Sequence, residues 1–571
     1  MNRERSNRWR VLAAVGVFGI VAAGCGSSDS GTSEEGEGDT STTPTTISAE
    51  DVEAGGELVI GAEQEPDCTD WIASCSGSSW GYWMMNVTTL PRSYDITADG
   101  DTWVYSPTSM IEGEAELTTD PKQVVTYKIS PDAVWSDGTP ITSTDFKYTW
   151  DQIANGDDIY DKSGYASIES VDDSDPATAV VTFSENYAPW KSLFGGQYGL
   201  LPSHLLEGKD RSAEMANGYE FSAGPWKIDK WEKGVEAVLV PNDAYWGDKP
   251  KLEKVTFRFV PDTSAEFSAF QAGEVMAIYP QPQPDVVEQI ESGLGDDVNS
   301  VYSADTGNIE ALWMNNAAPP LDSVVVRQAI AYAIDRNELV EALFGPLGVE
   351  EPSQSLNPPI LAPFSNNAFE MYEQDVDKVA ELLEGEGYAK NGDGIYEKDG
   401  ETLSLTIQST EGNARRELTE EVIQQQLEEV GIELKIENKQ AGDLFGEILP
   451  AGDYQIGLYA QVATNLDPSL CALFCSANIP GPDNDNSGQN WQRVNIPDLD
   501  TPLGIVDTSL DDEERQTASK DAETTMAENM ISLPLDPLPN ILLWSKDVVG
   551  PIQDNPIMGP FYNIHEWGLA G

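Results

Sequence analysis

Basic side chains and histidine are scarce in this chain. Its 571 residues include 32 Lys and Arg against 98 Asp and Glu, which gives a formal net charge of −66, and only two histidines, His204 and His565. A basic patch is hard to place on such a surface, so we predict no nucleic-acid partner. Two histidines also leave little material for a catalytic triad, which needs a histidine base.

Long apolar runs are almost absent. The one clear run is Val11–Ala23, preceded by Arg3, Arg5, Arg8 and Arg10. It is shorter than the roughly 20 residues that a permanent membrane helix needs, and it has the proportions of a secretory signal. No later segment is long and apolar enough to cross a bilayer.

The end of that run indicates how the protein is anchored. Ala22-Ala23-Gly24-Cys25 resembles the lipobox of bacterial lipoproteins, in which the cysteine is lipidated and becomes the mature N-terminus. We therefore predict a signal peptide over 1–24, lipidation of Cys25, and a place on the extracytoplasmic face of the membrane, in the periplasm or at the cell surface. A plain signal peptide cleaved nearby is the alternative.

Residues 25–54 follow as a predicted tether. Gly26–Ala54 consists largely of Gly, Ser, Thr, Asp and Glu. Such a segment cannot bury enough apolar surface to offset its ordering entropy, so we expect it to be disordered.

Cysteine is scarce as well, with five residues in all. Four follow Cys25, and an even number in an exported protein indicates disulfides, with three possible connectivities. We favour the local pairs Cys68–Cys75 and Cys471–Cys475. A four-cysteine zinc site is the alternative, but it usually requires two to about four residues between cysteines at both ends, and Cys68 and Cys75 are further apart. We expect no metal and no cofactor.

Strand-like and helical patterns alternate along the rest of the chain, which predicts an α/β fold with mixed sheets. The length exceeds what one hydrophobic core serves, so two or three lobes are expected. The strand predictions are Glu57–Ala62, Val124–Ile129, Ala179–Phe183, Val235–Pro241, Val255–Val260, Leu403–Gln408, Ile432–Glu437 and Tyr454–Tyr459. The helix predictions are Ser143–Ala154, Ala265–Ala272, Ser323–Ile334, Val376–Glu386 and Asn413–Val430. Thr142 and Asp145 form a capping-box pattern at the start of the first of these helices.

Five sequence blocks carry a family resemblance. They are VWSDGTPITSTDFKYTW (134–150), AGPWK (223–227) with Trp231, NDAYW (242–246) with KPKL (249–252), QAGEV (271–275) and RQAIAYAIDR (327–336). In this order they resemble the peptide/nickel family of bacterial solute-binding proteins, the receptors of ABC importers, and the resemblance covers roughly residues 56–570. Met276 departs from the pattern, because aspartate is usual there.

The resemblance implies a periplasmic-binding-protein-like fold of type II. In it two lobes joined by a hinge enclose the ligand, and a third domain is attached to the first lobe. Carried over, lobe I would comprise residues 55–96, 220–307 and 534–571, the extra domain 97–219, and lobe II 308–533. The implied partners are a small-molecule or peptide ligand and the permease subunits of an ABC importer, and we expect a monomer.

The stretch Ser74–Asn86 carries a motif that points elsewhere. Gly77-Ser78-Ser79-Trp80-Gly81 matches the G-x-S-x-G nucleophile elbow of hydrolases. An elbow needs a strand before its serine and a helix after it, and Ser79 instead follows a predicted disulfide loop. We therefore expect no enzyme, and an extracellular hydrolase remains the alternative function. Two polar loops also look briefly like cation sites. We interpret Asn391–Tyr396 as a turn rather than a calcium loop, and Asp483–Asn486 as a polar loop.

The aromatic run that follows Ser79 does not alternate as a half-buried core strand would. Continuous aromatic and methionine character fits the wall of a ligand cleft, with a plain core strand as the alternative. In the family this part of lobe I contributes to the cavity.

The motif Asp467-Pro468 indicates what kind of ligand the site could bind. Peptide-binding relatives commonly hold the ligand's α-amine with an aspartate four residues before this proline, and Thr464 stands there. A hydroxyl cannot neutralise a buried ammonium, so we do not expect this site to bind a free N-terminus through the usual ion pair. Either another carboxylate holds the amine, or the ligand is a neutral or apolar solute or a cation held over aromatic faces. The predicted ligand contacts are Trp80, Tyr82, Trp83, Trp313, Asn315, Tyr459 and Thr464.

Overall fold

A computed structural model describes residues 54–570, apart from 101, 197, 296, 305, 469 and 483–487. The predicted signal peptide, Cys25, nearly all of the predicted tether and the loop Asp483–Asn486 lie outside the described residues. None of the helices within the described range has both the length and the apolar character of a membrane span.

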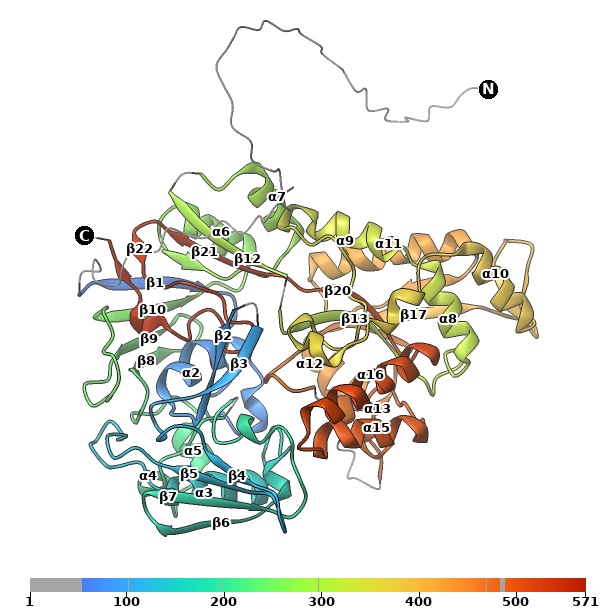
Figure 1. Cartoon of the computed structure of the whole chain (residues 1–571). Coiled ribbons are helices and arrows are strands. Elements are labelled where there is room, and N and C mark those ends of the chain that lie inside the picture. Colours follow the sequence, from blue (N-terminus) through green and yellow to red (C-terminus); the bar gives the residue numbers. More distant parts are fainter. Residues whose placement is uncertain are drawn as a thin grey trace, which may run out of the picture. The chain divides into compact units, whose positions relative to one another are not determined.

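A seven-stranded mixed sheet organises the first region (Figure 1). Its central strand β1 runs parallel to β10 and β11, and the other neighbours are antiparallel. The strands in sheet order are β12 (Val298–Ser303), β21 (Asn540–Ser545), β11 (Ala277–Ile278), β1 (Glu57–Ala62), β10 (Lys254–Phe259), β9 (Glu236–Pro241) and β8 (Trp226–Glu232). Helices α6 (Thr263–Gln271) and α7 (Pro284–Ser292) belong to this region.

A four-stranded antiparallel sheet forms a second region, with α3 (Ser143–Asn155) packed on β6 and β7. The strands in sheet order are β4 (Glu116–Thr118), β5 (Val124–Lys128), β7 (Thr178–Phe183) and β6 (Ile168–Asp175). Asp145 accepts a hydrogen bond from the Thr142 backbone at 2.9 Å, which confirms the predicted capping box. This region and the seven-stranded sheet share one continuous hydrophobic core. Short elements at their junction are the hairpin of β2 (Tyr94–Asp99) and β3 (Thr102–Pro107), α4 (Ser203–Leu206) and α5 (Arg211–Met215).

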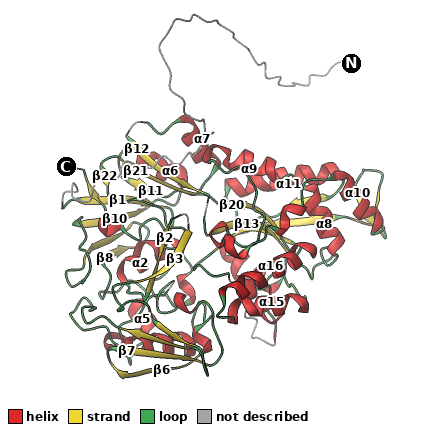
Figure 2. Ribbon diagram, viewed as in Figure 1, coloured by secondary structure: helices red, strands yellow, loops and turns green. Residues whose placement is uncertain are grey.

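A five-stranded mixed sheet with its own core forms the third region (Figure 2). The strands in sheet order are β18 (Glu433–Ile436), β17 (Ser404–Gln408), β19 (Ile456–Val462), β13 (Asn308–Met314) and β20 (Leu533–Pro537). Its helices are α8 (Val324–Ala333), α9 (Arg336–Phe344), α10 (Val376–Gly385), α11 (Ala414–Val430), α12 (Ala441–Asp443), α13 (Leu449–Ala451), α14 (Leu470–Phe474), α15 (Pro497–Thr508) and α16 (Asp512–Glu528). Small sheets elsewhere are a three-stranded one of β14 (Ala389–Lys390), β15 (Tyr396–Lys398) and β16 (Glu401–Thr402), and a pair of β22 (Val548–Val549) with β23 (Gly568–Leu569).

Two crossing points join the seven-stranded and five-stranded sheets. The chain passes from one to the other between β12 and β13, and it returns between β20 and β21. The crossings are hydrogen-bonded to each other: the Leu538 backbone N–H donates to the Asn308 carbonyl at 3.3 Å, and the Thr306 hydroxyl donates to the Leu538 carbonyl at 3.1 Å. Phe267 of α6 packs in the same apolar cluster as Phe344 of α9, beside these crossings.

Candidate functional site

A cavity of about 350 Å³ lies between residues of the seven-stranded and five-stranded regions. This volume is within the range of small-molecule sites, about 300–1,000 Å³. An adjoining cavity of about 150 Å³ shares part of its lining, including Tyr160 and Thr464. The larger cavity is lined by Ser76, Gly77, Ser78, Ser79, Tyr82, Trp83, Tyr160, Phe445, Tyr459, Ala460, Gln461, Val462, Ala463, Thr464, Leu473, Gln489, Trp491, Gln492, Pro556 and Ile557.

The first wall of the cavity is helical, not extended. The segment 79–89 consists of α1 (Ser79–Gly81), the π-helical turn η3 (Tyr82–Asn86) and α2 (Val87–Thr89). The Ser78 hydroxyl caps its start by accepting the Gly81 N–H at 3.2 Å. π-helical turns are rare and occur frequently at functional sites, because the inserted residue shifts which side chains share a face. The predicted alternative of a core strand is therefore wrong.

Only part of the aromatic run reaches the cavity. Tyr82 and Trp83 line it, whereas Met84 and Met85 are fully buried in the hydrophobic core. Trp80 lies behind Trp83, with ring centroids 5.9 Å apart, and is 5% exposed. Trp83 also packs closely against Gly559, where an added Cβ would lie 2.2 Å from the indole. A side chain at 559 would thus displace Trp83 from its place on the wall.

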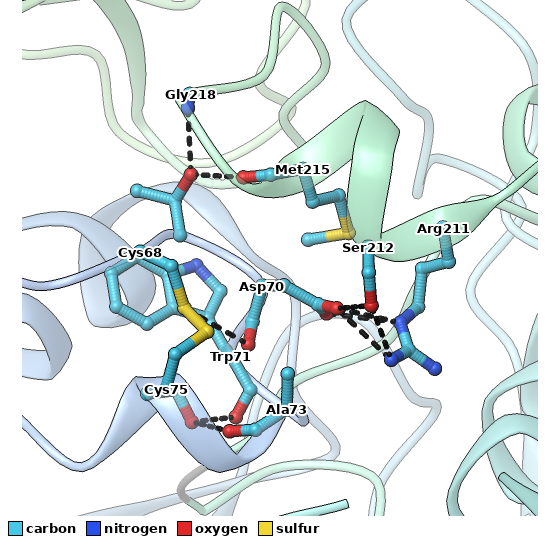
Figure 3. Close-up of a disulfide and its surroundings, with 11 residues drawn as sticks. Cys68, Asp70, Trp71, Ala73, Cys75, Arg211, Ser212, Met215 and Gly218 are labelled. Carbon is cyan, nitrogen blue, oxygen red and sulfur yellow. Dashed lines mark hydrogen bonds and ion pairs between the residues drawn. A yellow bond between two sulfur atoms is a disulfide. The ribbon is translucent and has the colours of Figure 1, made fainter. Parts of the chain in front are cut away.

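A disulfide loop braces this wall (Figure 3). Cys68 and Cys75, which are seven positions apart in the sequence just before Ser76, are bonded as predicted. Inside the loop, the buried Asp70 carboxylate accepts hydrogen bonds from Arg211 Nε at 3.0 Å and from the Ser212 hydroxyl at 2.8 Å. The Ser76 hydroxyl donates to the Trp71 carbonyl at 2.8 Å, which fixes the exit of the loop. The first wall is therefore tied to α5 by a buried ion pair.

The second wall begins at the C-terminal end of β19. β19 pairs with β13 along its whole length, but with β17 only at Ile456 and Gly457. From Tyr459 to Val462 the β17 side of this strand consequently has no partner strand among the described residues. Val462 is 38% exposed and lines the cavity. The unpaired backbone edge therefore borders the space where a ligand would lie.

Aromatic rings complete the second wall. The π-helical turn η9 (Leu444–Ile448) between α12 and α13 carries Phe445, whose ring lies 5.5 Å from that of Tyr459. Trp491 lies 6.3 Å from Tyr459. Behind them, Trp313 stacks on Tyr459 at 5.4 Å and donates its indole N–H to the Tyr459 carbonyl at 2.7 Å. Trp313 thus positions Tyr459 from the core side.

Of the seven predicted contacts, the structure brings Tyr82, Trp83, Tyr459 and Thr464 together in the lining. Trp80, Trp313 and Asn315 are absent from the lining. Trp313 is 1% exposed, and Asn315 is buried with its amide donating to the Gly452 and Tyr454 carbonyls at 3.0 Å. Sequence reasoning missed Tyr160, Phe445, Gln461, Gln489, Trp491 and Gln492. The aromatic members resemble the predicted ones in type, but no local pattern distinguishes the glutamines.

The lining carries no formal charge. None of the described residues that line the larger cavity is Asp, Glu, Lys, Arg or His. Burial raises the pKa of the Tyr82 and Tyr459 hydroxyls above the ordinary tyrosine value, so both remain neutral at physiological pH. Gln492 is 2% exposed, donates to the Tyr459 hydroxyl at 3.2 Å, and leaves its Oε1 without a hydrogen-bond partner.

Charges appear at the edge of the site, where the adjoining cavity contains Asp161 and Asp467. Asp467 is already occupied: Arg515 Nη2 lies 2.7 Å from one oxygen, and the Tyr105 hydroxyl donates to the other at 2.9 Å. The Asp161 carboxylate accepts from the Ser163 backbone and hydroxyl at 2.9 and 2.7 Å. No lysine or arginine lines either cavity within the described part of the chain.

Among the described residues, the other sequence motifs form neither a catalytic site nor a metal site. Ser79 opens a helix without a preceding strand, and the His204 ring is hydrogen-bonded to Asp137 at 2.9 Å in the region of α4. Asn391 forms the predicted turn, accepting from the Asp393 N–H at 3.0 Å. The second predicted disulfide, Cys471–Cys475, is present, and the described residues contain no cluster of three or more potential metal ligands.

Two sheets joined by two crossings, with a cavity between their regions, define a two-lobed binding protein of the type II periplasmic fold. The fold predicted from the sequence is thereby confirmed.

Comparisons with known proteins agree with this class. The model of bacterial extracellular solute-binding proteins, family 5 (middle), matches residues 111–478. The oligopeptide-binding protein OppA of Mycobacterium tuberculosis (strain ATCC 25618 / H37Rv) is 27% identical over 482 residues, covering 79% of this chain and 75% of that protein. OppA of Bacillus subtilis (strain 168) is 23% identical, covering 92% and 94%. The structure of the periplasmic EDTA-binding protein EppA superposes with a TM-score of 0.80 at 23% identity, covering 91% of this chain and 97% of that one.

The chain belongs to the bacterial extracellular solute-binding proteins of family 5. It is a solute-binding protein of the ABC-importer class, and the relatives it matches are named as binding proteins rather than as enzymes.

Proposed function

We propose that this protein captures a peptide-like or related small solute in the 350 Å³ cavity and delivers it to the permease of an ABC importer. The observation that carries the proposal is the placement of the cavity between two regions that are joined by two adjacent crossings. A ligand that touches both walls stabilises the arrangement in which they face each other. We assign the lobes as residues 55–96, 220–307 and 534–571 for lobe I and 308–533 for lobe II, with 97–219 as the extra domain.

Native mass spectrometry of the protein as purified tests capture directly. We expect a fraction of molecules to carry a non-covalent adduct of small-solute mass, and scattering from the stripped protein to show compaction when that solute is returned. Absence of compaction with the recovered solute would contradict hinge closure. Turnover of ester or peptide substrates would instead support a hydrolase, which no feature of the site favours.

We further propose that Cys25 carries the lipid that holds the protein at the extracytoplasmic face of the membrane. The signal-like run before Cys25 and the polar residues after it support this assignment. Cys25→Ala is expected to release the protein into the soluble fraction with unchanged ligand affinity. Undiminished membrane association of the variant would refute the anchor.

The way the ligand is held follows from Thr464. Thr464 lines the cavity and carries no charge, and the family resemblance implies that peptide-binding relatives commonly have an aspartate at this sequence position to hold the peptide's α-amine. We propose that Tyr82, Trp83, Tyr459 and Thr464 contact the ligand, and that Trp80, Trp313 and Asn315 act from behind the walls. Thr464→Ala should then weaken binding only modestly, by about twofold to fivefold, in a calorimetric titration with the recovered solute. A loss greater than about a hundredfold would mean that Thr464 makes the main polar contact.

A further inference from the structure

The charge of the cavity differs sharply from that of the chain around it. The sequence carries 98 acidic side chains, yet the larger cavity is lined by aromatic rings, amides, hydroxyls and small apolar groups without one Asp, Glu, Lys, Arg or His among its described residues. A charged ligand enclosed here would lose its hydration without gaining an ion-pair partner, and such burial is unfavourable. The lining therefore selects against charge in the enclosed part of the ligand.

Gln492 supplies the polar feature that a ligand must match. Gln492 lines the cavity, and its Nε2 donates to the Tyr459 hydroxyl at 3.2 Å, while its Oε1 is buried without a hydrogen-bond partner. A buried acceptor without a donor costs free energy, and that cost is recovered when a ligand donates to it. Because Gln492 occupies a lone pair of the Tyr459 oxygen, the tyrosine O–H remains available as a donor. The pair thus offers one acceptor and one donor, both neutral.

The aromatic rings add a shape requirement. Tyr82 and Trp83 face the cavity from the first wall, and Tyr459 and Trp491 from the second. Their faces accept flat, weakly polar groups such as the C–H face of a sugar ring or the plane of an amide. A cation is also attracted to aromatic faces, but one without an N–H or O–H cannot donate to Gln492.

We propose that the cavity takes an uncharged solute that has a flat face and donates an O–H or N–H hydrogen bond to Gln492 Oε1. This proposal rests on the proposed function, and it makes Gln492 and Tyr459 the residues that determine specificity. Two sources of ligand share the required chemistry: neutral saccharides, and peptides whose ends are blocked or cyclised. A free dipeptide fits poorly, because at neutral pH it carries both an ammonium and a carboxylate, and no cationic side chain lines either cavity in the described chain.

Calorimetry on the stripped full-length protein compares three probe sets: neutral disaccharides, N-acetylated dipeptide amides, and the same dipeptides with free ends. At least one uncharged set should bind about tenfold or more tightly than the free dipeptides. Its Kd should change by less than about twofold between roughly pH 6 and pH 9, since the probe is uncharged and no Asp, Glu, Lys, Arg or His is among the described residues that line the larger cavity. Which uncharged set binds identifies the source of the ligand.

Gln492→Met keeps the length of the side chain and removes both the acceptor and the Nε2 donor to Tyr459. It should weaken binding of the uncharged probe by about tenfold or more, about 1.4 kcal/mol, without lowering the unfolding midpoint. Gln424→Met is the matched control, because Gln424 donates to the Leu434 carbonyl away from the cavity. This variant should bind the probe as the wild type does.

Free dipeptides that bind as tightly as the blocked ones would overturn this inference and leave the proposed function standing. In that case Asp161→Asn, at the edge of the site, should abolish their binding, because it removes the nearest carboxylate not already held by an arginine. Failure of all three sets to bind would overturn this inference alone, because the proposed function is tested separately by the solute recovered with the purified protein.

Discussion

Two π-helical turns of five residues line the same cavity from its two walls, and they are supported in different ways. Tyr82–Asn86 and Leu444–Ile448 are each flanked by single α-helical turns, over residues 79–89 and 441–451. The first is braced by a disulfide and by the buried Asp70–Arg211 ion pair, and most of its side chains are buried or half-buried. In the second, the residues from Ala441 to Asp443 and from Gly446 to Glu447 are exposed.

This difference suggests how one site combines a fixed with an adaptable wall. The first turn holds Tyr82 and Trp83 on a rigid base, which lowers the cost of ordering them around a ligand. The second turn carries Phe445 on a segment with few buried contacts, the kind of segment that opens and shifts most easily. Substitutions that weaken one wall and leave the other intact should therefore have different effects on stability and on ligand affinity.

The largest effect is expected from Arg211→Met. The Arg211 and Asp70 side chains are 8% and 1% exposed, so the variant leaves a buried carboxylate without its cation. Removing one partner of a buried ion pair costs about 3–5 kcal/mol. Denaturant unfolding should show this loss, and ligand affinity should fall with it because the first wall loses its brace. Lys209→Met is the control: its pair with Glu214 is about half exposed on both sides, and its loss should cost less than about 1 kcal/mol. Equal effects of the two variants would remove the special role of the brace.

The disulfide of the first wall is expected to contribute next. Replacing Cys68 and Cys75 with serine frees a loop with a sequence separation of 7, and the chain-entropy model gives about 2–3 kcal/mol for a loop of this size. The same change at Cys471 and Cys475, with a separation of 4, should cost about 2 kcal/mol. Only the first double variant should also weaken ligand binding strongly. A stronger binding defect in the Cys471/Cys475 variant would reverse the assignment of the fixed wall.

Single aromatic truncations should separate the two walls by affinity. Trp83→Ala should weaken ligand binding by about tenfold or more, about 1.4 kcal/mol, because it removes the indole that lines the first wall and packs closely against Gly559. Phe445→Ala should weaken it by less than about fivefold, since the exposed turn adjusts and Trp491 still covers Tyr459. Calorimetry with the recovered solute measures both. A larger loss for Phe445→Ala would contradict the comparison.

A smaller effect concerns pH and lies beside the cavity, not in its walls. Burial raises the pKa of Asp507 to about 7, and the nearby Asp467 reinforces the shift while Arg515 opposes it. In the folded protein Asp507 therefore keeps its proton between about pH 4 and pH 7, where the unfolded chain has lost it. The folded state then binds more protons, so the contribution of Asp507 to stability declines as pH rises through this window.

Asp507→Asn should flatten that decline in the free energy of unfolding, measured at several pH values. Asp132→Asn, at an exposed position, should leave the profile unchanged. Stability that rises from pH 4 to pH 7 because of Asp507 would contradict the burial argument.

Local patterns explain what the sequence predicted well. Strand β1 was predicted with its observed bounds, Glu57–Ala62, because a short apolar run of β-branched residues and leucine after two glycines is a local signal. Helix α3 was predicted through its apolar face and the Thr142–Asp145 capping box. By contrast, the residues from Trp80 to Met85 have no clear period, so the π-helical turn was not predicted, and neither was the burial of both methionines.

The candidate site was only partly predictable for a related reason. Their aromatic character correctly indicated Trp83 and Tyr459 as lining residues. The same reasoning also selected Trp313, which stacks on Tyr459 from the core side and does not line the cavity. No local sequence pattern indicates that Gln492 lines the site. Its role arises from a contact with Tyr459, 33 positions earlier in the chain, and from the absence of a partner for its oxygen.

The most direct test is a crystal structure of the full-length protein with the tightest-binding solute. The account predicts ligand density between Trp83 and Tyr459, a hydrogen bond from the ligand to Gln492 Oε1, and no charged side chain in contact with the enclosed part of the ligand. A ligand bound outside this cavity, or an ammonium held there by Asp161 or Asp467, would contradict it.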